Sequence, residues 1–84
     1  SPKQQNQRNL AISLSLEASE VLEHFQWSEK SKDMDALKGE LADVALYLLQ
    51  LASISGIDLE QAILDKLEAN LQRVWPEDEK GGAS

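Results

Sequence analysis

Two pairs of acidic residues share one spacing, and that spacing suits the binding of a divalent cation. The pairs are Glu17-x-x-Glu20 and Glu40-x-x-Asp43. In a helix, residues three positions apart lie about 60° apart around the axis, so each pair can point in one direction. Glu17 and Glu40 each fall at the edge of an apolar stripe. Side chains at such edges can meet across a groove between two packed helices.

The distance between the two pairs along the chain favours a shared site. Nineteen residues separate Glu20 from Glu40, which suffices for a helical hairpin that turns the pairs toward each other. Four carboxylates at close range cannot all stay ionised unless a cation joins them. Mg²⁺ and Mn²⁺ prefer oxygen ligands of this kind. The alternative is that these acids are solvated helix residues, because glutamate is a good helix former.

Two aromatic residues and a histidine accompany the acids. Tyr47 follows Asp43 by four positions. Trp27 follows Glu20 by seven positions, so we expect it on the same stripe of the helix, and His24 lies on that helix too. An aromatic ring beside an acidic groove can stack on a nucleobase. The alternative for Trp27 is packing on the core at a helix end, and we expect His24 to be a partly buried polar residue rather than a ligand.

A third group of polar residues lies further along the chain. Lys66, Asn70 and Arg73 occupy positions i, i+4 and i+7 and fall within about 60° of one another on a helix. Such a stripe can contact phosphate or sugar oxygens. Alternatively, it is a solvated basic stripe near a helix C-terminus, where the helix dipole favours cations.

Three amphipathic helices must position these residues. The first is predicted from about Asn9, or from as early as Pro2, to about Trp27, after a polar extension over residues 1–8. The second is predicted from Met34 to Ser55. Its N-cap is Asp33 and its terminating glycine is Gly56. It is apolar around most of its circumference, so we expect neighbours on several sides. Its apolar residues are Leu37, Leu41, Val44, Ala45, Leu48, Leu49, Leu51 and Ala52.

The third helix is predicted to start at a capping box formed by Asp58 and Gln61 and to end near Val74, where Pro76 stops it. Residues 77–84 are polar and rich in glycine, and we expect a disordered tail there. The residues expected to face inward are Leu59, Ile63, Leu67, Leu71 and Val74.

Length and composition indicate one small domain, placed at residues 9–76, in a chain of 84 residues. The net charge of −7 disfavours nucleic acid and anionic membranes as partners. Cysteine is absent, and neither a signal peptide nor an apolar run long enough to span a bilayer is visible, so we expect a cytoplasmic protein. Three short helices cannot cover their own core. We therefore expect an all-α, four-helix-type bundle completed by oligomerisation, as a homodimer or homotetramer.

Four ordered blocks of the sequence resemble the MazG-type nucleotide pyrophosphohydrolases, which belong to the all-α NTP pyrophosphatases. The resemblance covers most of the chain and is far more specific than either acidic pair alone. The blocks are Asn9-Leu-Ala-Ile-Ser-Leu-Ser-Leu-Glu17-Ala-Ser-Glu20-Val-Leu-Glu-His-Phe-Gln-Trp27, Gly39-Glu40-Leu-Ala-Asp43-Val-Ala-Leu-Tyr47, Gly56-Ile-Asp-Leu, and Lys66-x-x-x-Asn70-x-x-Arg73.

The resemblance implies a Mg²⁺-dependent enzyme, with Mn²⁺ as the alternative metal. The reaction it implies converts a nucleoside triphosphate, usually a deoxy or aberrant one, to the monophosphate and pyrophosphate. Such a reaction serves house-cleaning of the nucleotide pool. The implied metal ligands are Glu17, Glu20, Glu40 and Asp43, of which we expect Glu20 and Glu40 to act in catalysis. The expected substrate contacts are Trp27, Tyr47, Lys66, Asn70 and Arg73.

The sequence also departs from the pattern of its subgroup, in which Trp27 matches a base-pocket aromatic. Members usually begin with another helix and a Pro-Lys/Arg-Asn-Leu step, whereas here five polar residues separate Pro2 from Arg8. Base-pocket residues from that helix are therefore expected to be absent or replaced. Leu16 stands where some members carry an acid.

Two other functions are open. One is a non-catalytic helical dimerisation module, in which the apolar second helix is an interface. The other is a phosphoribosyl-ATP pyrophosphohydrolase of the same superfamily, against which the Phe-Gln-Trp block that ends at Trp27 argues by resemblance.

Overall fold

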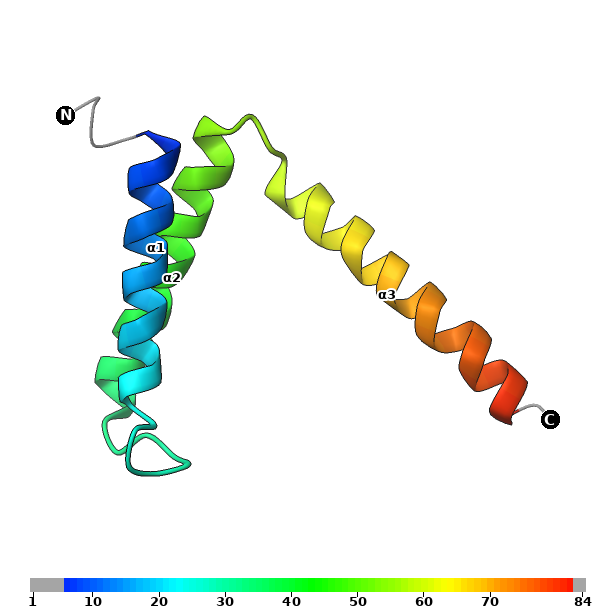
Figure 1. Ribbon diagram of the computed structural model, residues 1–84, viewed down its shortest axis with the longest axis horizontal. Coiled ribbons are helices and arrows are strands. Elements are labelled where there is room, and N and C mark those ends of the chain that lie inside the picture. Colours follow the sequence, from blue (N-terminus) through cyan, green and yellow to red (C-terminus); the bar gives the residue numbers. More distant parts are fainter. Residues whose placement is uncertain (1–5, 83–84) are drawn as a thin grey trace.

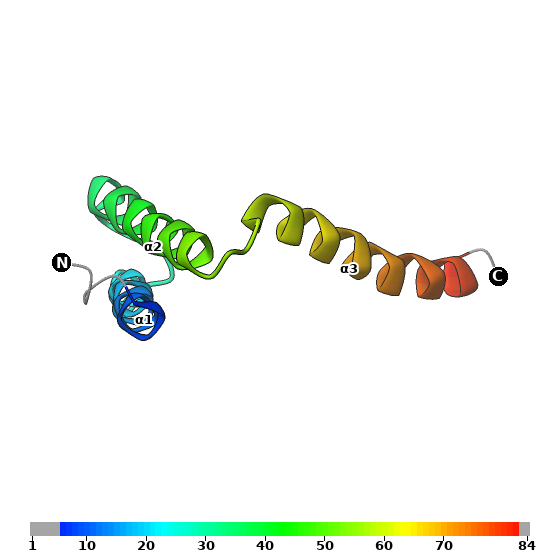
Figure 2. The same ribbon diagram turned by 90° about the horizontal axis from the view of Figure 1, so that it is seen from above.

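The computed structural model describes residues 6–82, with side chains as far as Arg73. It contains helices α1 (Gln7–Glu23), α2 (Met34–Ile54) and α3 (Leu59–Gly82) (Figure 1). No strand occurs between residues 6 and 82, which confirms the predicted all-α fold. Helices α1 and α2 lie side by side as a hairpin, and α3 extends away from them (Figures 1 and 2).

Local hydrogen bonds fix the start and the end of α1. The Asn6 side chain accepts a hydrogen bond from the backbone N–H of Asn9 at 2.7 Å and so caps the helix. The start expected at Pro2 lies outside the described residues. At the other end, the N–H groups of His24 and Phe25 bond to carbonyls three residues back, which tightens the last turn. The helix therefore ends at Glu23, and the prediction that it reaches Trp27 is wrong.

The ends of α2 agree with the sequence. The Asp33 carboxylate accepts the N–H of Ala36 at 3.0 Å, as a capping residue does. Gly56 adopts a φ of 68°, in the left-handed region that favours glycine. The N–H of Gly56 bonds to Ser53 and that of Ile57 bonds to Ala52, which forms a Schellman motif. These bonds confirm that α2 begins at Met34 and stops before Gly56.

Helix α3 begins as predicted but ends later. The Asp58 carboxylate accepts the N–H of Gln61 at 3.1 Å, whereas the Gln61 amide donates to Asp65 and leaves the second half of the capping box unmade. The helix continues to Gly82, beyond Pro76 and into the predicted tail. The expected stop near Val74 is therefore wrong. A proline inside a helix removes one hydrogen bond, at a finite cost of about 3 kcal/mol, and the strong helix formers that follow Pro76 favour continuation of the helix.

The chain by itself does not close a hydrophobic core. Only Leu10 and Ala52 are buried apolar residues in the described part. The radius of gyration is 17.6 Å, whereas a compact domain of this length has about 12 Å. Of the α3 residues expected to face inward, three are exposed because the helix points away from the hairpin, namely Ile63, Leu67 and Leu71. Leu59 is half-buried, and Val74 lies outside the residues whose side chains are described. The exposed large apolar residues of α3 are Ile63, Leu64, Leu67 and Leu71.

No single described helix has the length and apolar content needed to cross a membrane. Helix α2 and the α3 segment Leu59–Arg73 meet that requirement only when taken together, and their axes are bent by 103° at the connection.

Replacement of Gly56 by alanine should destabilise the protein by about 1–2 kcal/mol, because a Cβ atom disfavours the left-handed conformation. The added Cβ would meet no atom within 4 Å, so the cost comes from the backbone alone. Gly39→Ala is a matched control inside α2, where a Cβ also meets nothing, and should stabilise the helix by up to about 1 kcal/mol. Urea unfolding at one fixed protein concentration measures both. Equal effects of the two substitutions would contradict this account of the α2 terminus.

Candidate functional site

The hairpin brings acidic residues of α1 and α2 together. Glu17 and Glu20 lie one turn apart on α1 and are both partly buried. Glu40 is partly buried on α2, and Asp43 follows it by three residues on the same helix. Helices α1 and α2 run side by side (Figure 1). Glu17 interacts with Asp43, and Glu20 and Glu40 line one hollow, so the two pairs meet between the helices.

The Glu17 carboxyl lies among other acidic side chains. Partial burial, then the charge of Glu20, and then a hydrogen bond with Asp43 and its charge raise the pKa of Glu17 above its ordinary value. A protonated Glu17 carboxyl can donate that hydrogen bond, whereas two ionised carboxylates only repel each other. The Glu17 carboxyl is therefore close to acids of both helices, and a cation placed among them would relieve the repulsion.

Glu40 has a specific partner at the C-terminal end of α1, where His24 is the residue that caps the helix. The Nε2 atom of His24 lies 2.7 Å from the Oε1 atom of Glu40, and the Nδ1 atom lies 3.1 Å from the Ser31 hydroxyl. The His24 side chain is 12% exposed and that of Glu40 is 26% exposed. The expectation that His24 is partly buried is correct, but its contact with Glu40 was not anticipated. The spacing of His24, four residues after Glu20, was the available signal.

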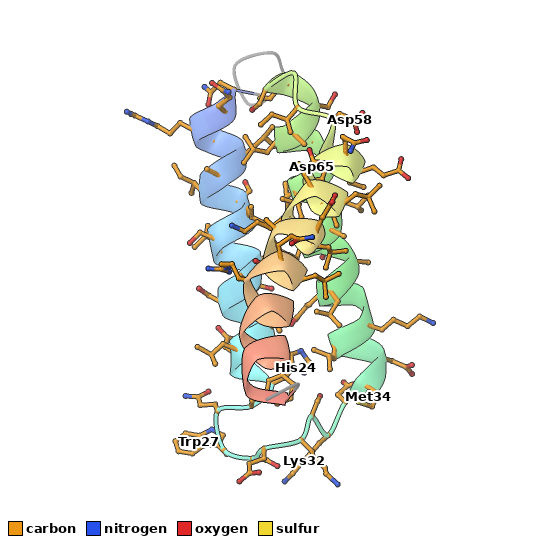
Figure 3. All side chains as sticks on the ribbon, turned by 90° about the vertical axis from the view of Figure 1, so that its right-hand side faces the viewer. His24, Trp27, Lys32, Met34, Asp58 and Asp65 are labelled. Carbon is orange, nitrogen blue, oxygen red and sulfur yellow. The ribbon has the colours of Figure 1, made fainter. Side chains whose placement is uncertain are left out.

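Two hollows adjoin this contact. One, of about 240 Å³, is lined by Glu20, Glu23, His24 and Glu40. The other, of about 200 Å³, lies beside the connection between α1 and α2, and its lining is Glu23, His24, Trp27, Ser28, Lys32 and Asp33. Glu23 and His24 line both, so they separate the acidic hollow from the one that contains Trp27. Figure 3 shows His24 where α1 ends, with Trp27 at the outer edge of the connection.

The acids are neighbours but do not form a closed ligand cage. Within the described residues, no three His, Asp or Glu side chains are grouped as they would be around a bound metal ion. All four acids offer carboxylate oxygens, which are the kind of ligand that Mg²⁺ and Mn²⁺ prefer. Mutual repulsion tends to separate such side chains when no cation joins them.

The expected substrate-contacting residues are more scattered. Tyr47 is partly buried on α2, one turn after Asp43. Trp27 is 89% exposed and lies in the connection, so the expectation that it continues the α1 stripe of Glu20 is wrong. The reason is the tightened last turn of α1, which redirects the chain before Trp27.

The polar stripe of α3 does not approach the acids within one chain. The Nη2 atom of Arg73 donates to the Oδ1 atom of Asn70 at 2.8 Å, which confirms that these residues share one side of α3. Lys66 is exposed. Helix α3 leads away from the hairpin, so the stripe can join the acids only through another copy of the chain or a movement of α3 (Figure 2).

Sequence and structure comparisons agree on one family. Residues 12–84 match the model of the MazG-like family. The chain is 39% identical over 75 residues to dCTP pyrophosphatase 1 of Mus musculus, covering 79% of this chain and 44% of that protein. It is 46% identical over 43 residues to a dATP/dGTP diphosphohydrolase of Salmonella phage PMBT28, covering 51% of this chain and 15% of that protein.

A solved structure supports the same assignment. A pyrophosphatase from Archaeoglobus fulgidus matches with a TM-score of 0.73 and 34% identity, covering 86% of this chain and 74% of that one. The present chain spans less than half the length of the mouse dCTP pyrophosphatase that it matches. The family model covers nearly all of the described residues, including all four acids. The chain therefore belongs to the MazG-like family.

Proposed function

We propose that this chain hydrolyses a nucleoside triphosphate, preferably a deoxynucleotide, to the monophosphate and pyrophosphate with the help of Mg²⁺. The observation that carries the proposal is the convergence of acids from α1 and α2, which raises the pKa of Glu17. The names of the mouse, phage and archaeal relatives support this class of reaction. The biological role would be removal of unwanted nucleotides from the pool.

The residues present fit a divalent cation by their chemistry. Glu17, Glu20 and Asp43 supply carboxylates at close range, and Glu40 lines the same hollow as Glu20. A hard cation such as Mg²⁺ or Mn²⁺ would be held by these oxygens, together with water and phosphate oxygens. No thiolate competes, because the sequence contains no cysteine.

Charge explains why the acids need a cation to bind a nucleotide. The chain carries a net charge of −7, and a nucleoside triphosphate carries about four negative charges, so direct binding would be repulsive. A bound Mg²⁺ would neutralise phosphate charge and lower the pKa of the attacking water.

The side chains of the site then have distinct tasks. Glu20 would accept the proton of the water that attacks the α-phosphorus, and pyrophosphate would leave from the same atom. Lys66 and Arg73 would balance phosphate charge, and Asn70 would contact the nucleotide. Trp27 and Tyr47 would border the base.

A second copy of the chain would complete this arrangement. Several large apolar residues of α2 and α3 are exposed, and solvent-facing surface of this kind favours association. We propose a homodimer or homotetramer in which helices of two chains form a four-helix-type bundle. The same exposed surface also fits a non-catalytic dimerisation module, so activity measurements must decide between the two functions.

The proposed activity is tested by pyrophosphate release from a panel of common and modified NTPs and dNTPs, with and without Mg²⁺. We expect release that depends on Mg²⁺ and that Glu40→Gln abolishes, because this substitution removes a carboxylate oxygen from the site. Circular dichroism of the variant should remain helical. Full activity of Glu40→Gln would contradict the site, and no release from any nucleotide would favour the dimerisation module. Turnover of phosphoribosyl-ATP alone would identify the superfamily alternative.

The raised pKa of Glu17 predicts how metal-free stability depends on pH. A folded-state pKa above the unfolded value means that the stabilising contribution of protonated Glu17 is lost as pH rises through the folded pKa. At pH 7 and without metal, Glu17→Gln should therefore unfold at a higher temperature than the wild type. This advantage should shrink as the pH falls toward the ordinary pKa of 4.5.

Added Mg²⁺ should raise the thermal unfolding midpoint of the wild type more than that of Glu17→Gln. Thermal unfolding of both proteins with and without Mg²⁺ measures the difference. The control is Glu68→Gln, at an exposed position of α3. If Glu68→Gln raises the metal-free unfolding temperature as much as Glu17→Gln does, the effect comes from the lower net negative charge of the chain. Reduced repulsion within the acidic cluster would then not explain it.

Sedimentation velocity tests the proposed assembly. We expect a dimer or tetramer, and we expect the double substitution Leu67→Asp with Leu71→Asp to shift it toward monomer, because both leucines are exposed in the single chain. Gln72→Asp adds charge to the same helix outside the apolar series and serves as the control. A monodisperse wild-type monomer would refute the assembly.

A further inference from the structure

We infer that His24 is a positioning residue that holds the Glu40 carboxylate in the orientation needed to bind a divalent cation. The inference rests on the proposed function, because it assigns His24 a role in that same site. His24 belongs to none of the expected ligand or substrate groups, and its assignment comes from its contacts in the folded chain.

The His24 ring joins two segments through its two nitrogen atoms. An ionised carboxylate can only accept hydrogen bonds, so Nε2 of His24 donates to Oε1 of Glu40, 2.7 Å away. Nδ1 shares a hydrogen bond with the Ser31 hydroxyl at 3.1 Å. The Ser31 hydroxyl oxygen also accepts the backbone N–H of Asp33 at 3.2 Å. One ring nitrogen is therefore hydrogen-bonded to Ser31, two residues before the N-cap of α2, and the other is hydrogen-bonded to Glu40 on that helix.

The surroundings of this contact make it more rigid than an exposed polar pair. The His24 side chain is nearly buried, and Glu40 is mostly shielded. A hydrogen bond to a charged acceptor is shorter and stronger than a neutral one, in agreement with the 2.7 Å separation. Within the described residues, no buried side-chain nitrogen or oxygen lacks a hydrogen-bond partner. Loss of the imidazole would leave Glu40 without this donor in a partly dehydrated position.

The consequence for metal binding follows from the neighbours of Glu40. Glu20 and Glu23 line the same hollow as Glu40, and carboxylates that share a site repel one another unless they are held in place. The hydrogen bond from His24 goes to Oε1, so Oε2 is the oxygen of Glu40 that would act as a ligand. Partners of this kind, which orient a metal ligand without touching the metal, typically contribute 10–100-fold to metal affinity or activity.

Two amide substitutions separate the two contacts of the ring. In His24→Gln the amide nitrogen falls at the place of Nε2, so it can still donate to Glu40. In His24→Asn the shorter side chain places its amide at the position of Nδ1, so it can reach Ser31 but not Glu40. The two variants differ by a single methylene group and both remain polar.

The measurement is Mn²⁺ titration into the substrate-free full chain, followed by calorimetry or by the electron paramagnetic resonance of free Mn²⁺. We expect His24→Asn to raise the Mn²⁺ dissociation constant by about 10–100-fold and His24→Gln to retain most of the wild-type affinity. The Mg²⁺ concentration needed for half-maximal pyrophosphate release should shift in the same order. A purely structural role of the ring would not distinguish the two amides in this way.

Ser55→Ala is the matched control. It removes another side-chain hydrogen bond between α1 and α2, from Gln7 to Ser55 at 2.8 Å, at the opposite end of the hairpin. We expect a lower thermal midpoint for this variant with an unchanged affinity for Mn²⁺. A loss of affinity in Ser55→Ala equal to that of His24→Asn would overturn the inference, because any loosening of the hairpin would then suffice.

The outcomes also distinguish this inference from the proposed function. Tight Mn²⁺ binding by the wild type together with unchanged affinity in His24→Asn, or equal losses in both amide variants, would overturn the role of His24 alone. A wild-type chain that binds no Mn²⁺ and releases no pyrophosphate would overturn both proposals.

Discussion

The close approach of carboxylates from α1 and α2 is the constraint on which the site depends. Packing of the two helices places Glu17 near both Glu20 and Asp43, and the raised pKa of Glu17 records the unfavourable energy of that arrangement. A fold selected for stability alone would separate these charges, whereas one that binds a divalent cation gains from keeping them together. The repulsion in the metal-free chain and the proposed affinity for metal have the same physical origin.

Uncovered apolar surface is the second constraint, and it links the fold to the site. Helix α3 meets α2 only near their connection and leaves Leu67 and Leu71 exposed. The same helix carries Lys66 and Arg73, so the helix with exposed apolar residues also carries basic side chains that can pair with phosphate. Association through α3 would bury apolar residues and bring basic side chains toward an acidic site in one step.

Local signals in the sequence predicted much of the secondary structure. The predicted ends of α2 were correct because both signals are local. The Asp33 cap and the left-handed Gly56 affect only the few residues next to them. The predicted end of α1 was too late, because the residues after Glu23 do not reveal where the last turn of the helix tightens. The predicted end of α3 was too early, since a single proline destabilises a helix without always ending it.

The sequence by itself determined which residues share a helix face, because the period of 3.6 residues per turn is a local property. It therefore predicted that Glu17 and Glu20 act together, and that Asn70 and Arg73 lie side by side. Only the tertiary structure decided which side chains meet across helices. The hydrogen bond from His24 to Glu40 spans sixteen residues and depends on the relative rotation of α1 and α2. That rotation is set by packing along the whole hairpin, which no single motif encodes.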